Sequence, residues 1–180
     1  MIGALRGAGV EFDQGLQEHE LTTIERTYGI TFPTDLRSLL GLGLPVSGGF
    51  PNWRRAPKVG LLELLARPIE DVRFDILKNA FWLPEWGPRP DDPGSALAVA
   101  DAYLAKAPKL IPIYLHRYLP EEPPMSGNPV FSVMQTDVVY YGMDLADFFS
   151  KEFNIPSFSS PPTEPRQTRF WSRLADVNTA

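Results

Sequence analysis

Hydrophobic residues recur at helical spacing in the first quarter of the chain. Residues 16–28 place most of their charged side chains outside one apolar face, which predicts an amphipathic helix. Gly29 is suited to end that helix, and Pro33 is suited to the first turn of a second one. The apolar positions of the two helices are Leu21, Ile24, Tyr28, Leu36, Leu39 and Leu40. Because few residues separate these helices, we expect an N-terminal helical hairpin.

The middle of the chain gives weaker patterns. Residues 59–65 fit a short strand or a helical turn equally well, and residues 68–77 are similarly ambiguous although their apolar positions have helical spacing. After a turn at residues 90–94, Ser95 is expected to cap a helix that ends at Pro108. The residues expected to face inward from that helix are Leu97, Ala100, Tyr103, Leu104 and Ala107.

Short apolar runs typical of strands follow. Residues 110–115 predict one strand, and residues 129–134 and 138–141 predict a β-hairpin. Asp144 is then expected to cap a helix with apolar residues Leu145, Phe148, Phe149 and Phe153. Helices precede and follow the strands without regular alternation. This order favours an α+β fold with a central, mainly antiparallel or mixed sheet flanked by helices.

The C-terminal segment differs in composition from the rest of the chain. Residues 154–166 are rich in Pro and Ser and predict an extended tail. Phe170, Trp171 and Leu174 then fall on a possible short helix, which we expect to dock on the body because a disordered tail rarely carries such residues. We therefore expect one α+β domain over residues 1–153 and, over residues 154–180, a tail whose aromatic segment docks back.

Composition restricts the classes of function. The chain has 180 residues, of which 43% are hydrophobic, and it contains no cysteine, which excludes disulfides, thiolate metal sites and cysteine nucleophiles. The net charge is −5, and the densest basic cluster is only Arg54, Arg55 and Lys58, so no nucleic-acid partner is expected. No apolar run is long enough to span a membrane, and residues 1–14 lack a signal-peptide layout. These features predict a cytoplasmic protein.

A tryptophan- and proline-rich segment is the most distinctive stretch of the chain. Residues 81–90 contain two tryptophans and three prolines, which predicts a rigid loop that either caps the core or presents a binding surface. Packing is the favoured role for Trp82, whereas Trp53 and Trp86 fit packing and partner contact about equally. Arg89 would place a guanidinium beside the indoles.

Catalytic and metal-binding patterns are weak. Glu85 stands out between a proline and a tryptophan, but Asp91 and Asp92 are accounted for by a turn and a helix start. His116, which we expect near the end of a strand, has no nucleophile motif beside it, and His19 does not form a zinc-binding pattern. We expect no catalytic residue, metal or cofactor, and keep a hydrolase built on Glu85 and His116 as a third hypothesis.

Two further positions concern interactions within the sheet. Arg117 is expected to pair with an acidic residue of the fold. Tyr140 and Tyr141 lie behind the hairpin tip, and strand alternation sends one ring to each face of the sheet. We expect one ring in the core and the other available for contact with a partner.

The order of these segments resembles the SUKH superfamily, which includes fungal cell-wall-assembly regulators and many bacterial immunity proteins. The segments that carry the resemblance are residues 28–33 (YGITFP), 36–40, 50–53 (FPNW), 81–87 (FWLPEWG), 111–113 (IPI), 116–118 (HRY), 127–132 (GNPVFS), 140–142 (YYG), 145–149 and 170–171. The resemblance implies an α+β fold, no enzymatic activity and protein binding. Bacterial members are widely linked to the neutralisation of toxins delivered between cells.

The leading hypothesis is therefore a non-enzymatic immunity protein that occludes a bacterial toxin domain with an acidic face bearing aromatic residues. The candidate contact residues are Trp53, Trp82, Glu85, Trp86, Arg89, Tyr140 and Tyr141. The alternative is a small-molecule or glycan-binding module that uses the tryptophan-rich loop. The sequence determines neither the partner nor the oligomeric state.

Overall fold

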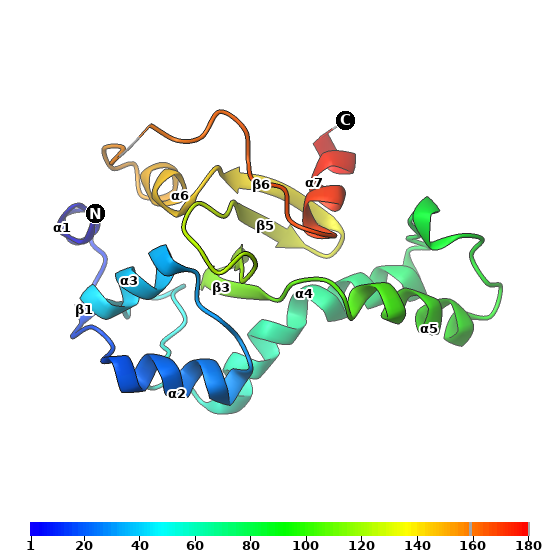
Figure 1. Ribbon diagram of the computed structural model, residues 1–180, viewed down its shortest axis with the longest axis horizontal. Helices are drawn as coiled ribbons and strands as arrows, with labels where there is room; N and C mark the ends of the chain where they lie inside the picture. The colour runs from blue at the N-terminus through cyan, green and yellow to red at the C-terminus, as the bar shows by residue number, and fades with distance from the viewer. Residues whose placement is uncertain (159, 180) are drawn as a thin grey trace.

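Four antiparallel strands and the helices around them make up most of the chain. The computed structural model describes residues 1–158 and 160–179, and over these residues it has an α+β fold with seven α-helices and two antiparallel sheets (Figure 1). The four-stranded sheet has the order β3-β4-β5-β6, and the two-stranded sheet pairs β1 with β2. The elements are α1 (Ile2–Gly7), β1 (Phe12–Asp13), α2 (Glu18–Tyr28), α3 (Thr34–Leu42), β2 (Leu44–Pro45), α4 (Lys58–Lys78), η1 (Pro84–Trp86), α5 (Pro93–Leu104), β3 (Leu110–Tyr114), β4 (Arg117–Pro120), β5 (Val130–Met134), β6 (Asp137–Gly142), α6 (Leu145–Glu152) and α7 (Trp171–Thr179).

The first two predicted helices correspond to α2 and α3. Gly29 ends α2 in the left-handed conformation, with φ 60°, and Pro33 directly precedes α3. Arg37 of α3 forms an ion pair with Glu18 of α2 at 2.7 Å. The N-terminal placement of the predicted hairpin is not confirmed, because α1 and β1 precede these helices and β1 pairs with β2.

The two ambiguous segments in the middle of the chain belong to a single 21-residue helix, α4, with Pro68 inside it. Proline in a helix interior removes a hydrogen bond and costs about 3 kcal/mol, which is why the pattern looked interrupted. Leu61, Val72 and Ile76 are buried at helical spacing on the same side as Pro68. The packing of this face outweighs the local penalty.

The start of α5 differs from the prediction. Asp92, not Ser95, is the N-cap, and its carboxylate accepts a hydrogen bond from the backbone nitrogen of Ser95 at 2.7 Å. Tyr103 is exposed instead of facing inward. The buried positions of this helix are Ala96, Ala100 and Leu104.

The sheet confirms the predicted hairpin, which is formed by β5 and β6. Between β3 and this hairpin the structure adds β4, so that Arg117 and Tyr118 begin a strand and His116 lies in the turn before it. Strand β4 has only four residues and ends in proline, which makes its sequence signal short. Asp144 caps α6 as predicted, with its carboxylate accepting from the backbone nitrogen of Asp147.

The four-stranded sheet separates two hydrophobic cores. Ile111, Leu119 and Val130 pack with α2, α3 and α6 in the first core. The second core combines the other face of the sheet with α4, α5, η1 and α7. Trp171 and Leu174 of α7 lie in this second core, so the aromatic C-terminal segment packs on the body of the fold.

Candidate functional site

Two of the tryptophans expected to contact a partner lie in the cores. Trp53 and Trp86 are each only 5% exposed. The ring of Trp53 meets Phe32 edge-on at 5.2 Å, and Trp86 stacks on Tyr103 at 5.9 Å and on Phe170 at 6.4 Å. Of the two roles left open for Trp53 and Trp86, their burial supports packing, because large rings that find aromatic neighbours remove more apolar area from water in the core.

The rest of the tryptophan-rich loop caps the second core. Trp82 is half-buried, meets Trp86 edge-on at 5.1 Å and donates its indole N–H to the carbonyl of Gly87 at 2.7 Å. The Arg89 guanidinium lies 6.0 Å from the Trp82 ring and donates to the carbonyl of Ile76. Glu85 is exposed and forms an ion pair with Arg173 at 3.1 Å.

Tyr140 and Tyr141 occupy opposite faces of the sheet, as strand alternation predicts, but neither is exposed. Tyr140 packs on Phe131 at 5.2 Å, and burial raises the pKa of its hydroxyl. Tyr141 lies under the guanidinium of Arg117, 3.9 Å from its ring centroid. Both rings are half-buried, and each packs at the edge of one of the two cores.

Glu85 and His116 are not brought into one site. His116 lines a cavity of about 440 Å³ with Phe50 and Tyr114, and Glu85 is not part of its lining. Burial lowers the pKa of His116, and the neighbouring Arg117 guanidinium lowers it further. Arg117 forms the expected ion pair, with Glu152 at 3.8 Å. The structure thus gives the hydrolase hypothesis no convergent pair of groups.

The described residues contain neither a metal-binding cluster nor a membrane-spanning helix. Among the described residues, no group of three or more His, Cys, Asp and Glu side chains could hold a metal ion. Over the same part of the chain, every helix is too short or too polar to cross a bilayer.

A groove of about 610 Å³, which we call the loop groove, lies beside the β4–β5 connection. It is lined by Gly29 and Thr31 between α2 and α3, by Pro108, by residues 121–124 of the connection and by residues 167–169 of the C-terminal segment. Four separate segments of the chain therefore meet around it. None of its lining residues was a candidate from the sequence.

The β4–β5 connection that forms one wall of the groove is held by a buried side chain. Asn128 is fully buried, donates to the carbonyls of Pro120 and Pro123 at 2.9 Å each, and accepts from the Arg166 guanidinium at 2.7 Å. Asp35 of α3 accepts a hydrogen bond from the backbone nitrogen of Gly127 at 3.0 Å, and burial raises its pKa. These contacts fix the shape of the wall.

Two adjacent carboxylates give the groove its chemical character. Glu121 accepts from the backbone nitrogens of Thr31 at 3.1 Å and Lys109 at 3.3 Å, whereas Glu122 pairs with Arg169 at 2.5 Å. Both partners of the second pair are largely exposed, so this ion pair is readily exchanged for another. The signal available in the sequence was the acidic pair before two prolines, residues 121–124, which is typical of a rigid, charged loop.

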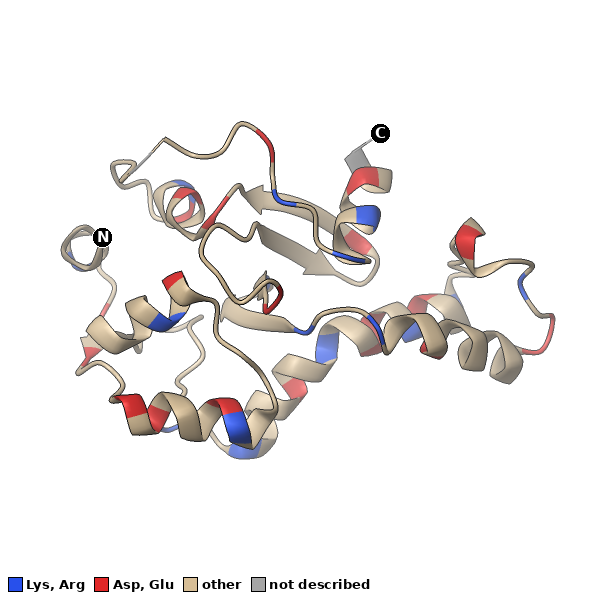
Figure 2. Cartoon of the chain, viewed as in Figure 1, with Lys and Arg blue, Asp and Glu red and all other residues tan. Residues whose placement is uncertain are grey.

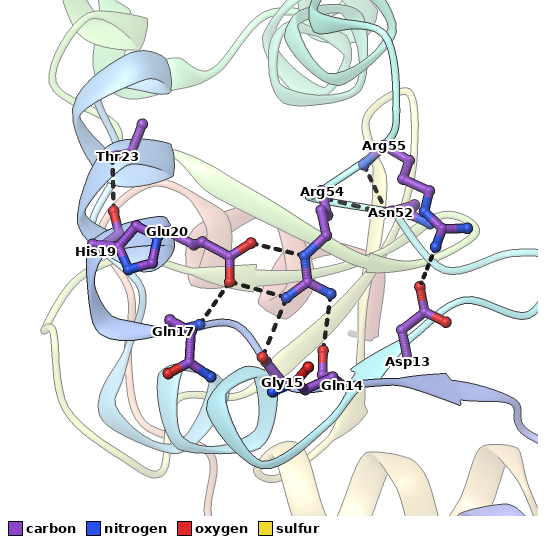
Figure 3. Close-up of polar contacts among 10 residues, drawn as sticks. All are labelled: Asp13, Gln14, Gly15, Gln17, His19, Glu20, Thr23, Asn52, Arg54 and Arg55. Carbon is purple, nitrogen blue, oxygen red and sulfur yellow. Dashed lines mark hydrogen bonds and ion pairs between the residues drawn. The ribbon is translucent and has the colours of Figure 1, made fainter.

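A second polar cluster lies at the start of α2 and is shown in Figure 3. Arg54 binds the carboxylate of Glu20 through Nε at 2.7 Å and Nη2 at 3.0 Å, and it also donates to the carbonyls of Gln14 and Gly15. Arg55 pairs with Asp13 at 3.3 Å. The two arginines of the densest basic cluster in the sequence are thus paired with carboxylates. Figure 2 shows both signs of charge along α2 and α4.

The Arg54 contacts predict acid sensitivity. The guanidinium of Arg54, followed by the backbone N–H of Gln17, lowers the pKa of Glu20 from 4.5 to about 2. Because the folded-state pKa lies below the unfolded one, this pair stabilises the protein above about pH 4.5, and the contribution is lost as pH falls through about 2. We expect Glu20→Gln to lower the free energy of unfolding by about 1 kcal/mol at pH 7, measured by urea unfolding. Between about pH 4.5 and 2, the free energy of unfolding of this variant should fall by less than that of the wild type.

The control for this prediction is Glu164→Gln, because Glu164 is exposed and has no ion-pair partner among the described residues. It removes the same charge and should follow the wild-type pH profile. Identical pH profiles for Glu20→Gln and wild type would contradict the prediction.

No family model matches the chain, and neither a curated protein nor a solved structure shows detectable similarity to it.

Proposed function

We propose that the protein is a non-catalytic, cytoplasmic binding domain that acts as an immunity protein of the SUKH type and occludes a bacterial toxin domain. The observation that carries the proposal is the loop groove, which is open, acidic and held in shape by the contacts of Asn128. The resemblance of the sequence to SUKH proteins supports the class of partner. The net charge of −5 supports a basic partner surface, such as that of a nuclease.

The proposed contact face is acidic and does not include Trp53 or Trp86. Trp53 and Trp86 are core residues, so the proposed contact moves to Glu121, Glu122 and the prolines that follow them. Glu121 is occupied by two backbone N–H donors and mainly shapes the groove. Glu122 is the residue proposed to bind a lysine or arginine of the partner, which would replace the exposed guanidinium of Arg169.

The small-molecule or glycan-binding alternative has less support. It depended on indole rings that line a concave surface, but Trp86 is covered by Tyr103 and Phe170 and Trp82 contacts it edge-on. The loop groove contains no tryptophan.

The test is binding to candidate toxin domains, measured by titration calorimetry and by rescue of cells that express the toxin. Glu122→Lys should weaken binding by more than about tenfold, because it places a like charge against the basic partner. Asp91→Lys is the matched control: it makes the same change in net charge on an exposed turn before α5 and should bind nearly as wild type at physiological salt.

Two outcomes would contradict the proposal. Equal weakening by both variants would show that only net charge matters and that the loop groove is not the contact. Failure to bind any candidate toxin domain, together with no rescue of toxin-expressing cells, would count against the immunity function itself.

A further inference from the structure

Helix α4 carries an exposed apolar stripe along almost its whole length. Its large members are Val59, Leu62, Phe74 and Leu77, which are 65%, 42%, 47% and 42% exposed. Together with Ala66 and Glu70 they follow one another at separations of three or four residues, so they share one side of the helix. We call these six residues the α4 stripe.

The stripe lies opposite the side of α4 that the fold uses. Of the buried residues on that side, Leu61 packs in the first core, and Val72 and Ile76 pack in the second core. Four large exposed apolar side chains on one side of a helix are more than the isolated exposed residues that a soluble surface ordinarily carries. Within the described chain, each of the four remains at least 42% exposed.

The spacing of the stripe positions is symmetric about residue 68. An antiparallel copy of α4, related by a two-fold axis there, would place Val59 opposite Leu77 and Leu62 opposite Phe74 of the other copy. Ala66 would lie opposite Glu70 of the other copy. Because the side chain of Ala66 is small, the two helices can approach each other at the centre. Each contact would occur twice, as a two-fold interface requires.

The charges beside the stripe have the same symmetry. Glu63 has no ion-pair partner within the described chain, and the same two-fold axis would place it opposite Arg73 of the other copy. Arg73 uses Nε for Asp101 and Nη1 for Glu70, which leaves Nη2 available for a further carboxylate. We propose that the α4 stripe is a homodimer interface in which two copies of this chain pair their α4 helices antiparallel about residue 68.

This proposal is independent of the proposed function, because the loop groove shares no residue with the stripe. The first test is the mass in solution by sedimentation equilibrium. We expect twice the 20.1 kDa of the chain for wild type, and a dissociation constant more than about tenfold higher for Leu62→Glu and for Phe74→Glu. Both sites are exposed, so the variants should keep the wild-type circular dichroism spectrum.

Leu42→Glu is the matched control, because Leu42 is 76% exposed at the end of α3 and lies outside the stripe. It should dimerise as wild type does. A wild-type monomer up to about 100 μM, or a dimer that Leu62→Glu and Phe74→Glu leave intact, would overturn the proposal. Capture of a different protein by a monomeric chain would equally overturn it.

The second test determines the register and uses the absence of cysteine from the chain. When Leu62→Cys and Phe74→Cys variants are mixed and oxidised, the two opposite positions should crosslink into a disulfide-linked dimer. Neither variant should crosslink alone, because antiparallel pairing separates the two copies of residue 62 by about 18 Å along the helix axis. Crosslinking of each variant alone, or no crosslink in the mixture, would overturn the antiparallel register.

Discussion

Replacing Trp171 with alanine is expected to lower the free energy of unfolding by about 3–5 kcal/mol. Its side chain is fully buried, its indole N–H donates to the carbonyl of Pro108 at 2.7 Å, and its ring meets Phe170 edge-on at 4.9 Å. The substitution would leave a cavity in the second core and a buried carbonyl without its donor. Urea unfolding followed by circular dichroism measures the loss.

Val177→Ala is the control on the same helix, because Val177 is exposed. It should change the free energy of unfolding by less than about 0.5 kcal/mol. If Trp171→Ala were equally mild, α7 would be an appended tail and not part of the core. The expected large loss means that truncation before α7 would also destabilise the sheet, since α7 packs on β6.

Replacing Gly15 with alanine should also destabilise the protein strongly, by about 3 kcal/mol or more. A methyl group at Gly15 would lie 2.0 Å from the carbonyl oxygen of Gly41 and 2.5 Å from its carbonyl carbon. Both atoms belong to the backbone, so no side-chain movement relieves the contact. The backbone nitrogen of Leu16 also donates to the carbonyl of Leu40 at 2.8 Å, and that hydrogen bond would have to lengthen.

Gly48→Ala separates this contact from the general effect of replacing glycine. A methyl group at Gly48 has open space around it, and the substitution reduces the freedom of the unfolded chain. We expect Gly48→Ala to be neutral or stabilising by up to about 1 kcal/mol, measured in the same unfolding experiment. If Gly15→Ala and Gly48→Ala lowered the free energy of unfolding by similar amounts, the contact with the Gly41 backbone would not explain the effect at Gly15.

The elements that were predicted correctly have local causes. Helix α2 combines an apolar face with Gly29 at its end, and α6 has its capping residue, Asp144, directly before it. The β5–β6 hairpin joins two apolar strands through a turn of residues close in sequence. Such signals lie within a few residues of the structure that they determine.

The elements that were missed depend on distant residues. Helix α4 continues through Pro68 because the sheet and α5 bury that face, and no local pattern contains this information. Strand β4 is short and exists through its pairing with β3 and β5. Tertiary packing overrides weak local preference in both cases.

The candidate site illustrates the same limit. The sequence identified aromatic residues suited to binding, but Trp53 is covered by Phe32 and Trp86 by Phe170, which are 21 and 84 positions away. The loop groove likewise requires residues 29–31, 121–124 and 167–169 to meet. Exposure and concavity are properties of the assembled surface.

The sequence alone determined the α+β class, most of the helices and the docking of the aromatic C-terminal segment, because periodicity, caps and the hydrophobic effect act on residue types wherever they lie. Only the tertiary structure decided which rings stay in water, where the acidic groove forms and which side of α4 is left uncovered. These outcomes depend on which distant surfaces meet, and the free energy of burial is a property of the contact between them.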